Sequence, residues 1–145
     1  METLKQLLHD GKKAIDGNDT ATALKCFEKA LELERDPIAC SGLAYCLAKE
    51  RGAFSQAKSL CAEALRQDPR NVEHYLLMGR IYTLAGNKRD AIRIFRKGLK
   101  IGFNRQIQDE LEALGKRKSP VLPFLDRKNP INKYLGKLFV KLGLR

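Results

Sequence analysis

Residues 75–95 read YLLMGRIYTLAGNKRDAIRIF, and this stretch carries the clearest structural signal in the chain. Its apolar residues return three and four positions apart on both sides of Gly86-Asn87, a pair typical of turns. The spacing therefore predicts two amphipathic helices joined by a short turn. On the second helix, Phe95 follows Ala91 one turn later, so a small and a large apolar residue share one face.

The same pattern recurs at an interval of 34 residues, which brings residues 4–37, 38–71 and 72–105 into register. Three apolar columns of similar size result: Ala23/Ala57/Ala91, Phe27/Cys61/Phe95 and Leu31/Leu65/Leu99. A repeat of this length is typical of stacked helical or solenoid units. Asn18-Asp19, Gly52 and Gly86-Asn87 interrupt each unit at its middle, so each unit is predicted to be a helix-turn-helix. No β-branched alternation is present, and we expect an all-α solenoid.

The third unit resembles the tetratricopeptide repeat pattern W-x₂-L-G-x₂-Y…A-x₃-F, with Tyr in place of Trp and Met in place of Leu. The residues that carry this resemblance are Tyr75, Met78, Gly79, Tyr82, Ala91 and Phe95. The resemblance implies a solenoid of three repeats whose first helices line a concave groove for a peptide or protein segment.

By the same resemblance, a set of first-helix residues would contact the partner in the groove. These residues are Lys5, Lys12, Cys46, Lys49, Arg80 and Thr83. The positive charge of Lys12, Lys49 and Arg80 favours an apolar or acidic peptide. Members of the family that bind chaperones hold a terminal carboxylate with polar groups, but here Leu8, Leu43 and Leu77 occupy those places and Glu73 would repel the ligand. A chaperone-tail specificity is therefore disfavoured.

Residues 106–114 are predicted to form a capping helix, because a repeat array must cover the apolar face of its last unit. Ile107, Leu111 and Leu114 form an apolar stripe that should face inward. The acidic residues Asp109, Glu110 and Glu112 should face outward. Residues 1–115 are thus expected to form one solenoid domain.

Residues 116–145 form a different, strongly basic tail. The chain has a net charge of +11, and residues 115–145 contain nine basic side chains against Asp126 alone. Pro120 and Pro123 predict an extended connector, which resembles the tails of a group of bacterial tetratricopeptide proteins. A helix is predicted over 130–142, with one apolar face made of Ile131, Tyr134, Leu135, Leu138, Phe139 and Leu142.

This apolar face needs a cover, and three are conceivable: the solenoid, a second copy of the chain, or a membrane surface. We expect docking against protein, in cis or in a homodimer, with the Pro120–Pro123 segment as a strap over the last repeat. Nucleic acid is disfavoured as a partner, because Trp is absent and both Tyr134 and Phe139 lie on the packing face.

Catalysis has little support in the sequence. His9 and His74 are expected to be solvated and far from a nucleophile, Cys26 and Cys61 to be buried, and Cys46 to be more exposed. No phosphate-binding loop, metal motif or cofactor motif is present, so we expect neither an enzyme nor a bound cofactor or metal. The scattered cysteines favour a reduced, cytoplasmic chain. We expect an adaptor or scaffold that acts through its groove; the alternative is a factor at the membrane surface, or an assembly factor, that acts through its basic tail.

Overall fold

The computed structural model describes residues 2–115 and 130–143, and every regular element in these ranges is an α-helix. The chain divides into two units, Met1–Leu114 and Gly115–Arg145. The predicted helical solenoid is confirmed for the first unit.

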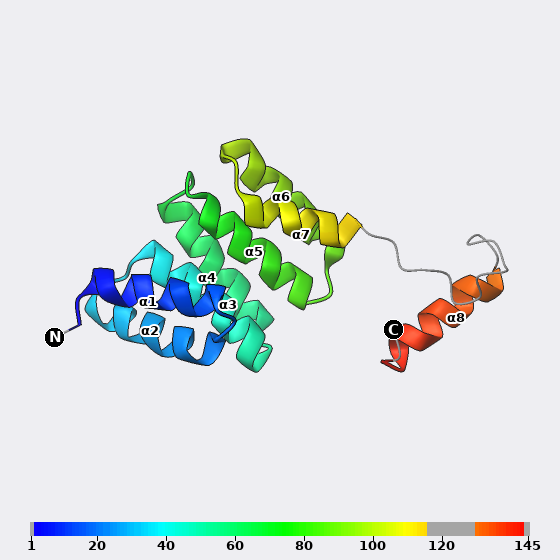
Figure 1. Ribbon diagram of the computed structural model, residues 1–145, viewed down its shortest axis with the longest axis horizontal. Helices are drawn as coiled ribbons and strands as arrows, with labels where there is room; N and C mark the ends of the chain where they lie inside the picture. Colours follow the sequence, from blue (N-terminus) through cyan, green and yellow to red (C-terminus); the bar gives the residue numbers. More distant parts are fainter. Residues whose placement is uncertain (1, 116–129, 144–145) are drawn as a thin grey trace. The chain divides into compact units, whose positions relative to one another are not determined.

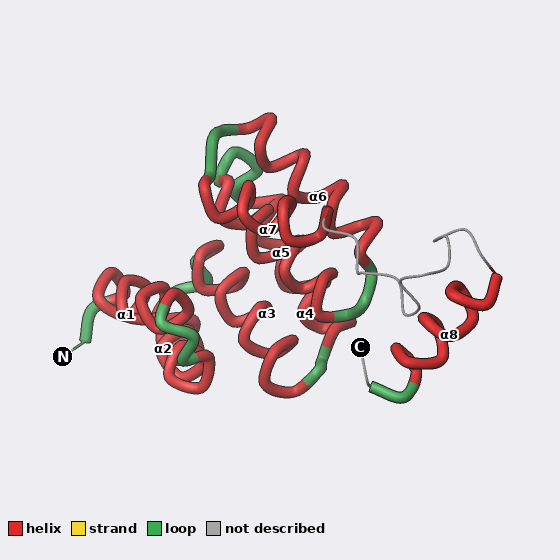
Figure 2. The backbone as a smooth tube through the Cα atoms, turned by 45° about the vertical axis from the view of Figure 1, so that its right-hand side comes forward, coloured by secondary structure: helices red, strands yellow, loops and turns green. Residues whose placement is uncertain are grey.

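Six helices of the first unit form three consecutive pairs, and a seventh follows them (Figures 1 and 2). The pairs are α1 (Leu4–Asp16) with α2 (Thr20–Leu33), α3 (Pro37–Arg51) with α4 (Phe54–Gln67), and α5 (Val72–Leu84) with α6 (Lys88–Ile101). The seventh helix, α7, spans Arg105–Gly115. Each pair corresponds to one of the 34-residue units in the sequence.

Polar residues cap the N-termini of three helices at the breaks that the sequence predicts. The side chains of Asp19, Asn71 and Asn87 each accept a hydrogen bond from a backbone N–H in the first turn of α2, α5 and α6. These bonds satisfy amide groups that have no partner within the helix. Gly52 and Gly86 adopt φ angles of 62° and 79°, which a glycine reaches without steric cost. The turns between paired helices are therefore determined locally.

The small residues of the repeat allow the paired helices to approach closely. Ala23, Ala57 and Ala91, which share one column of the repeat, have no exposed surface. The Phe27 ring packs so closely that a Cβ added to Gly11 or Gly42 would lie within 2.7 Å of it. Burial of such a ring stabilises the fold by about 1.5–3 kcal/mol, and only glycine leaves room for it on both neighbouring helices.

Helix α7 covers the end of the array as predicted. Ile107 is fully buried in a cluster with Phe95 and Leu76, and Leu111 and Leu114 pack against the same cluster. Asp109 and Glu112 are exposed. The prediction for Glu110 was wrong: its carboxylate accepts a hydrogen bond from Arg80 Nε at 2.8 Å. Glu110 therefore faces α5 and joins the cap to the last repeat.

Helix α8 (Pro130–Lys141) is the regular element of the second unit within 130–143. Ile131, Tyr134 and Leu142 are exposed, whereas Leu135, Leu138 and Phe139 are half-buried. The predicted Pro120–Pro123 strap lies outside the described residues, and docking of the tail stays a prediction. Among the described residues, no helix is both long enough and apolar enough to cross a membrane.

Candidate functional site

The first helices of the three repeats surround a small apolar pocket. Its floor and walls include Ile15 of α1, Phe27 of α2, Gly42 of α3 and Leu76 and Leu77 of α5. The cavity volume is about 70 Å³, well below the few hundred Å³ typical of cofactor sites. The pocket is therefore suited to a single apolar side chain of a larger partner.

Two polar contacts link α1 to later helices at this pocket. Lys12 Nζ of α1 lies 2.9 Å from Glu73 Oε1 of α5. Gln106 Nε2 of α7 donates to Asp16 Oδ1 of α1 over 3.4 Å, although 90 residues separate them in the chain. All four residues line the pocket. The superhelical arrangement of the repeats therefore brings opposite ends of the solenoid together at one site.

A second, more open hollow shares Ile15, Asp16 and Arg80 with the pocket, so the two are continuous. Tyr45, Thr83 and Glu110 also line it. The Arg80 guanidinium lies 5.8 Å from the centroid of the Tyr45 ring, a cation–π distance. We call the pocket and this hollow together the groove. It runs along α1, α3, α5 and α7.

The structure brings several of the predicted contact residues to the groove. Lys12 lines the pocket, Thr83 lines the hollow, and Arg80 lines both. Lys49 contacts the side-chain oxygen of Asn18 and lies 6.0 Å from the Tyr45 ring centroid, beside the hollow. Lys5 is exposed and lines neither part of the groove.

The prediction that Cys46 is accessible was wrong. Cys46 has no exposed surface and packs in the cluster that contains Leu7 and Phe27. Its burial raises the pKa of the thiol to about 12, so it is protonated and unreactive at neutral pH. Cys26, expected to be buried, is half-exposed, whereas Cys61 is fully buried as predicted.

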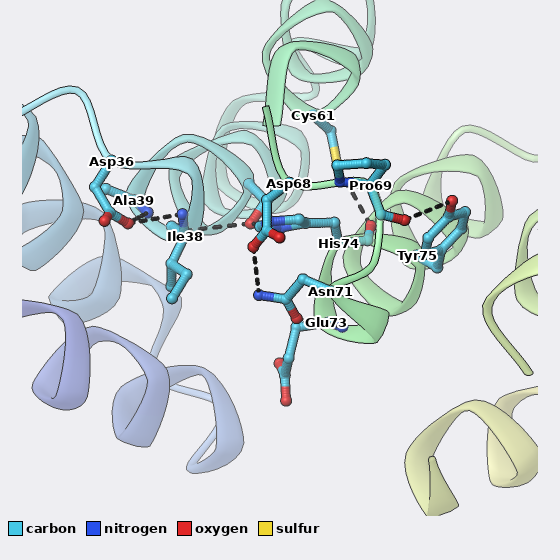
Figure 3. Close-up of polar contacts among 11 residues, drawn as sticks. Asp36, Ile38, Ala39, Cys61, Asp68, Pro69, Asn71, Glu73, His74 and Tyr75 are labelled. Carbon is cyan, nitrogen blue, oxygen red and sulfur yellow. Dashed lines mark hydrogen bonds and ion pairs between the residues drawn. The ribbon is translucent and has the colours of Figure 1, made fainter. Parts of the chain in front are cut away.

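The prediction of a solvated His74 was also wrong, whereas His9 is exposed as expected. His74 has no exposed surface, and its Nδ1 lies 2.8 Å from Ser41 Oγ. Its Nε2 lies 3.4 Å from Asp68 Oδ2, although without hydrogen-bond geometry (Figure 3). Burial lowers the pKa of His74, while the Asp68 carboxylate opposes that shift.

Ser41, His74 and Asp68 lie next to one another in space, in the order of a catalytic triad. Ser41, however, is only 1% exposed, and its hydroxyl donates to the Ile38 carbonyl oxygen at 3.2 Å. A nucleophile must reach a substrate, and this hydroxyl is committed to groups within the core. The arrangement therefore links α3 to α5 and has no geometry for catalysis.

Sequence reasoning missed three polar groups of the groove, Asp16, Gln106 and Glu110. Glu73 was placed in the groove by the 34-residue register, in one column with Lys5 and Ala39, but its pairing with Lys12 was not predicted. Their partners lie 30 to 90 residues away in the chain, so no local pattern reveals the pairs.

The fold defines a class of protein, the helical-repeat solenoids. Residues 48–114 match the family model for the tetratricopeptide repeat. Solved structures agree: the Arabidopsis OM64 TPR domain is 22% identical with a TM-score of 0.60, and the match covers 79% of this chain and 96% of that one. Residues 48–114 therefore contain the tetratricopeptide repeat, and the fold of the described solenoid is that of tetratricopeptide repeat domains.

Two further solved structures have the same fold. The Sgt2 TPR domain from Aspergillus fumigatus is 17% identical with a TM-score of 0.62, and covers 90% of this chain and 93% of its own. The second TPR domain of human RPAP3, solved in complex with the HSP70 peptide SGPTIEEVD, is 16% identical with a TM-score of 0.58, and covers 79% and 100%. No curated protein matches the chain in sequence.

Proposed function

We propose that this protein is a non-catalytic interaction module that binds a peptide or an extended protein segment in its groove. The observation that carries this proposal is the apolar pocket between α1, α3 and α5, which is open to solvent and sized for one side chain. The fold it shares with a human TPR domain solved with a peptide gives further support.

The charges of the groove favour an apolar anchor over an acidic tail. Lys12 is paired with Glu73, and Arg80 with Glu110. Because acidic groups accompany both cations, the groove offers little net positive charge to a multiply acidic peptide. We therefore propose a partner segment with one large apolar side chain and mixed flanking charge, and no chaperone-type acidic tail.

The Lys12–Glu73 pair is compatible with ligand entry. Its side chains are 55% and 35% exposed, and ion pairs this accessible contribute about 1 kcal/mol or less. A bound peptide can separate them and take over either charge. The pair thus lines the pocket in the free protein and opposes ligand binding little.

Selection from a random peptide library on the full chain tests the proposal. The selected peptides should share one bulky apolar residue, and Ile38→Glu, at the edge of the pocket, should weaken their binding at least tenfold. Leu33→Glu is the matched control, because Leu33 is 59% exposed but lines no part of the groove. Equal loss in both variants, or no shared apolar residue, would remove the proposed site.

The location in the cell is part of the same proposal. The four cysteines are free thiols, three of them buried, and this supports a reducing, cytoplasmic setting.

The exposed apolar residues of α8 support docking of the tail against protein. The protein surface is either the same chain or a second copy in a homodimer, and a membrane surface is the alternative cover.

A further inference from the structure

Helix α6 carries a line of basic side chains on its solvent side. Its members are Arg89, Arg93, Arg96 and Lys100, and we call them the basic stripe. They follow one another at intervals of four, three and four residues, so they share one face and extend over about 16 Å of helix. All four are exposed, on the side opposite to the buried Ala91, Phe95 and Gly98.

The fold does not require this charge. The matching positions of α4, 34 residues earlier, are Ser55, Ser59, Ala62 and Arg66, and those of α2 are Ala21, Lys25, Glu28 and Glu32. These helices take the same place in their repeats without a basic stripe. Like charges one turn apart also destabilise a helix, so the stripe is a property of the third repeat that the solenoid itself does not explain.

The stripe is almost free of acidic partners. Arg93 is paired with Asp90 at 2.7 Å, and Arg89, Arg96 and Lys100 pair with no acidic side chain within residues 2–115. Lys97 lies alongside and lines the same open surface. Positive charge therefore dominates this surface, with Asp90 as the acidic residue beside it.

Two large apolar side chains stand at the C-terminal end of the stripe. Phe103 is 76% exposed and Ile101 is 43% exposed. Ile101 shares a surface hollow with Lys100 and Arg70, so the apolar and basic groups are adjacent. Phe103 lies 34 residues after Pro69, at the matching position of the third repeat, and its exposed ring contributes little to the core.

We propose that the basic stripe and Phe103 form a docking surface for an anionic lipid bilayer. A convex helix face with charge of one sign complements a plane of anionic headgroups, and exposed Ile and Phe side chains can enter the interfacial layer beside them. A nucleic acid would also attract the charges, but Phe103 offers a stacking plane for one base and the neighbouring Ile101 offers none, whereas single-strand sites stack successive bases on several aromatic rings. None of the stripe lines the groove, so the two surfaces can act together.

Vesicle sedimentation of the full chain tests the electrostatic part. Vesicles of phosphatidylcholine with phosphatidylserine should bind it, pure phosphatidylcholine vesicles should not, and salt should weaken binding. The variant Arg89→Gln/Arg96→Gln/Lys100→Gln should lose at least tenfold in affinity. The control Lys13→Gln/Lys25→Gln/Arg51→Gln removes the same charge at exposed positions elsewhere in the solenoid and should lose less than threefold.

Fluorescence tests insertion, because the chain contains no Trp. Phe103→Trp places a single fluorescent reporter at the end of the stripe. Leu33→Trp places one at the last residue of α2, where the Leu33 side chain is exposed. Anionic vesicles should shift the emission of the first reporter to the blue and leave the second unchanged. Circular dichroism checks that each variant keeps its helices.

Three outcomes would overturn the proposal. Equal losses in the two triple variants would assign membrane binding to total charge or to the tail. An unshifted Phe103→Trp emission would show that no apolar side chain inserts there. Absence of vesicle binding, together with stripe-dependent binding of a DNA duplex, would make the stripe a nucleic-acid surface instead.

Discussion

His74 Nδ1 lies 2.8 Å from Ser41 Oγ, and this contact joins α5 to α3 inside the core. The two residues are 33 positions apart, and both are buried. The contact gives a polar partner to an imidazole that burial would otherwise destabilise. It therefore connects the second and third repeats through an imidazole whose pKa is lowered by burial.

Stability should fall as the pH drops below about 6.5, the ordinary pKa of histidine in an unfolded chain. Burial lowers the pKa of His74 in the folded protein, so below this pH the unfolded state binds more protons than the folded state. The free energy of unfolding then falls by up to about 1.4 kcal/mol per pH unit until the folded-state pKa is passed. Urea titrations at pH 7.5, 6.5 and 5.5 measure the effect.

His74→Gln should be less stable than the native chain but should lose this dependence between pH 7.5 and 5.5. His9→Gln is the control, because His9 is exposed on α1 and should leave the profile unchanged. A native profile that is flat over this range would contradict the assignment to a buried neutral imidazole.

Ala57→Leu should destabilise the second repeat. Ala57 has no exposed surface at the crossing of α3 and α4, and three added carbon atoms have no space there. Overpacking of this kind costs about 1–3 kcal/mol, which a thermal melt detects. The same change at Ala113, which is exposed on α7, should shift the melt little. Matching melts would mean that the repeat register is wrong.

The Arg80–Glu110 pair should contribute more to stability than an exposed pair on the same cap. Its side chains are 19% and 28% exposed, and Nε lies 2.8 Å from Oε1. A double-mutant cycle with Arg80→Gln and Glu110→Gln should give a coupling near 1 kcal/mol, whereas Arg105 with Asp109, at 77% and 58% exposure, should give about 0.3 kcal/mol. Equal couplings would show that partial burial adds nothing.

Deletion of residues 119–145 should lower the melting temperature or dissociate a dimer, if the tail docks against protein as we propose. The reason is the apolar face of α8, where Ile131, Tyr134 and Leu142 are 56%, 69% and 60% exposed. Calorimetry and light scattering on the full and shortened chains measure both effects. If neither changes while binding to anionic vesicles is lost, the tail acts at a membrane.

The 34-residue register determined the helical pairs and the burial of the alanine column. These features depend on local chemistry, because helix periodicity and capping act within a few residues. The basic stripe can also be found in the sequence, at intervals of four, three and four residues. The net charge of the chain, however, is concentrated in residues 115–145, and this favours the tail over α6 as the basic surface.

Burial along α3, and the pairing of charges in the groove, were decided only by the tertiary structure. Helix α3 packs against α1, α2, α4 and α5, so Cys46 is enclosed where a helix with one buried face would leave it accessible, and Ser41 meets His74 inside the core. Lys12–Glu73 and Asp16–Gln106 depend on the curvature of the solenoid. Periodicity specifies which face of a helix is apolar, but the packing of neighbouring repeats determines how many faces are covered and which distant side chains meet.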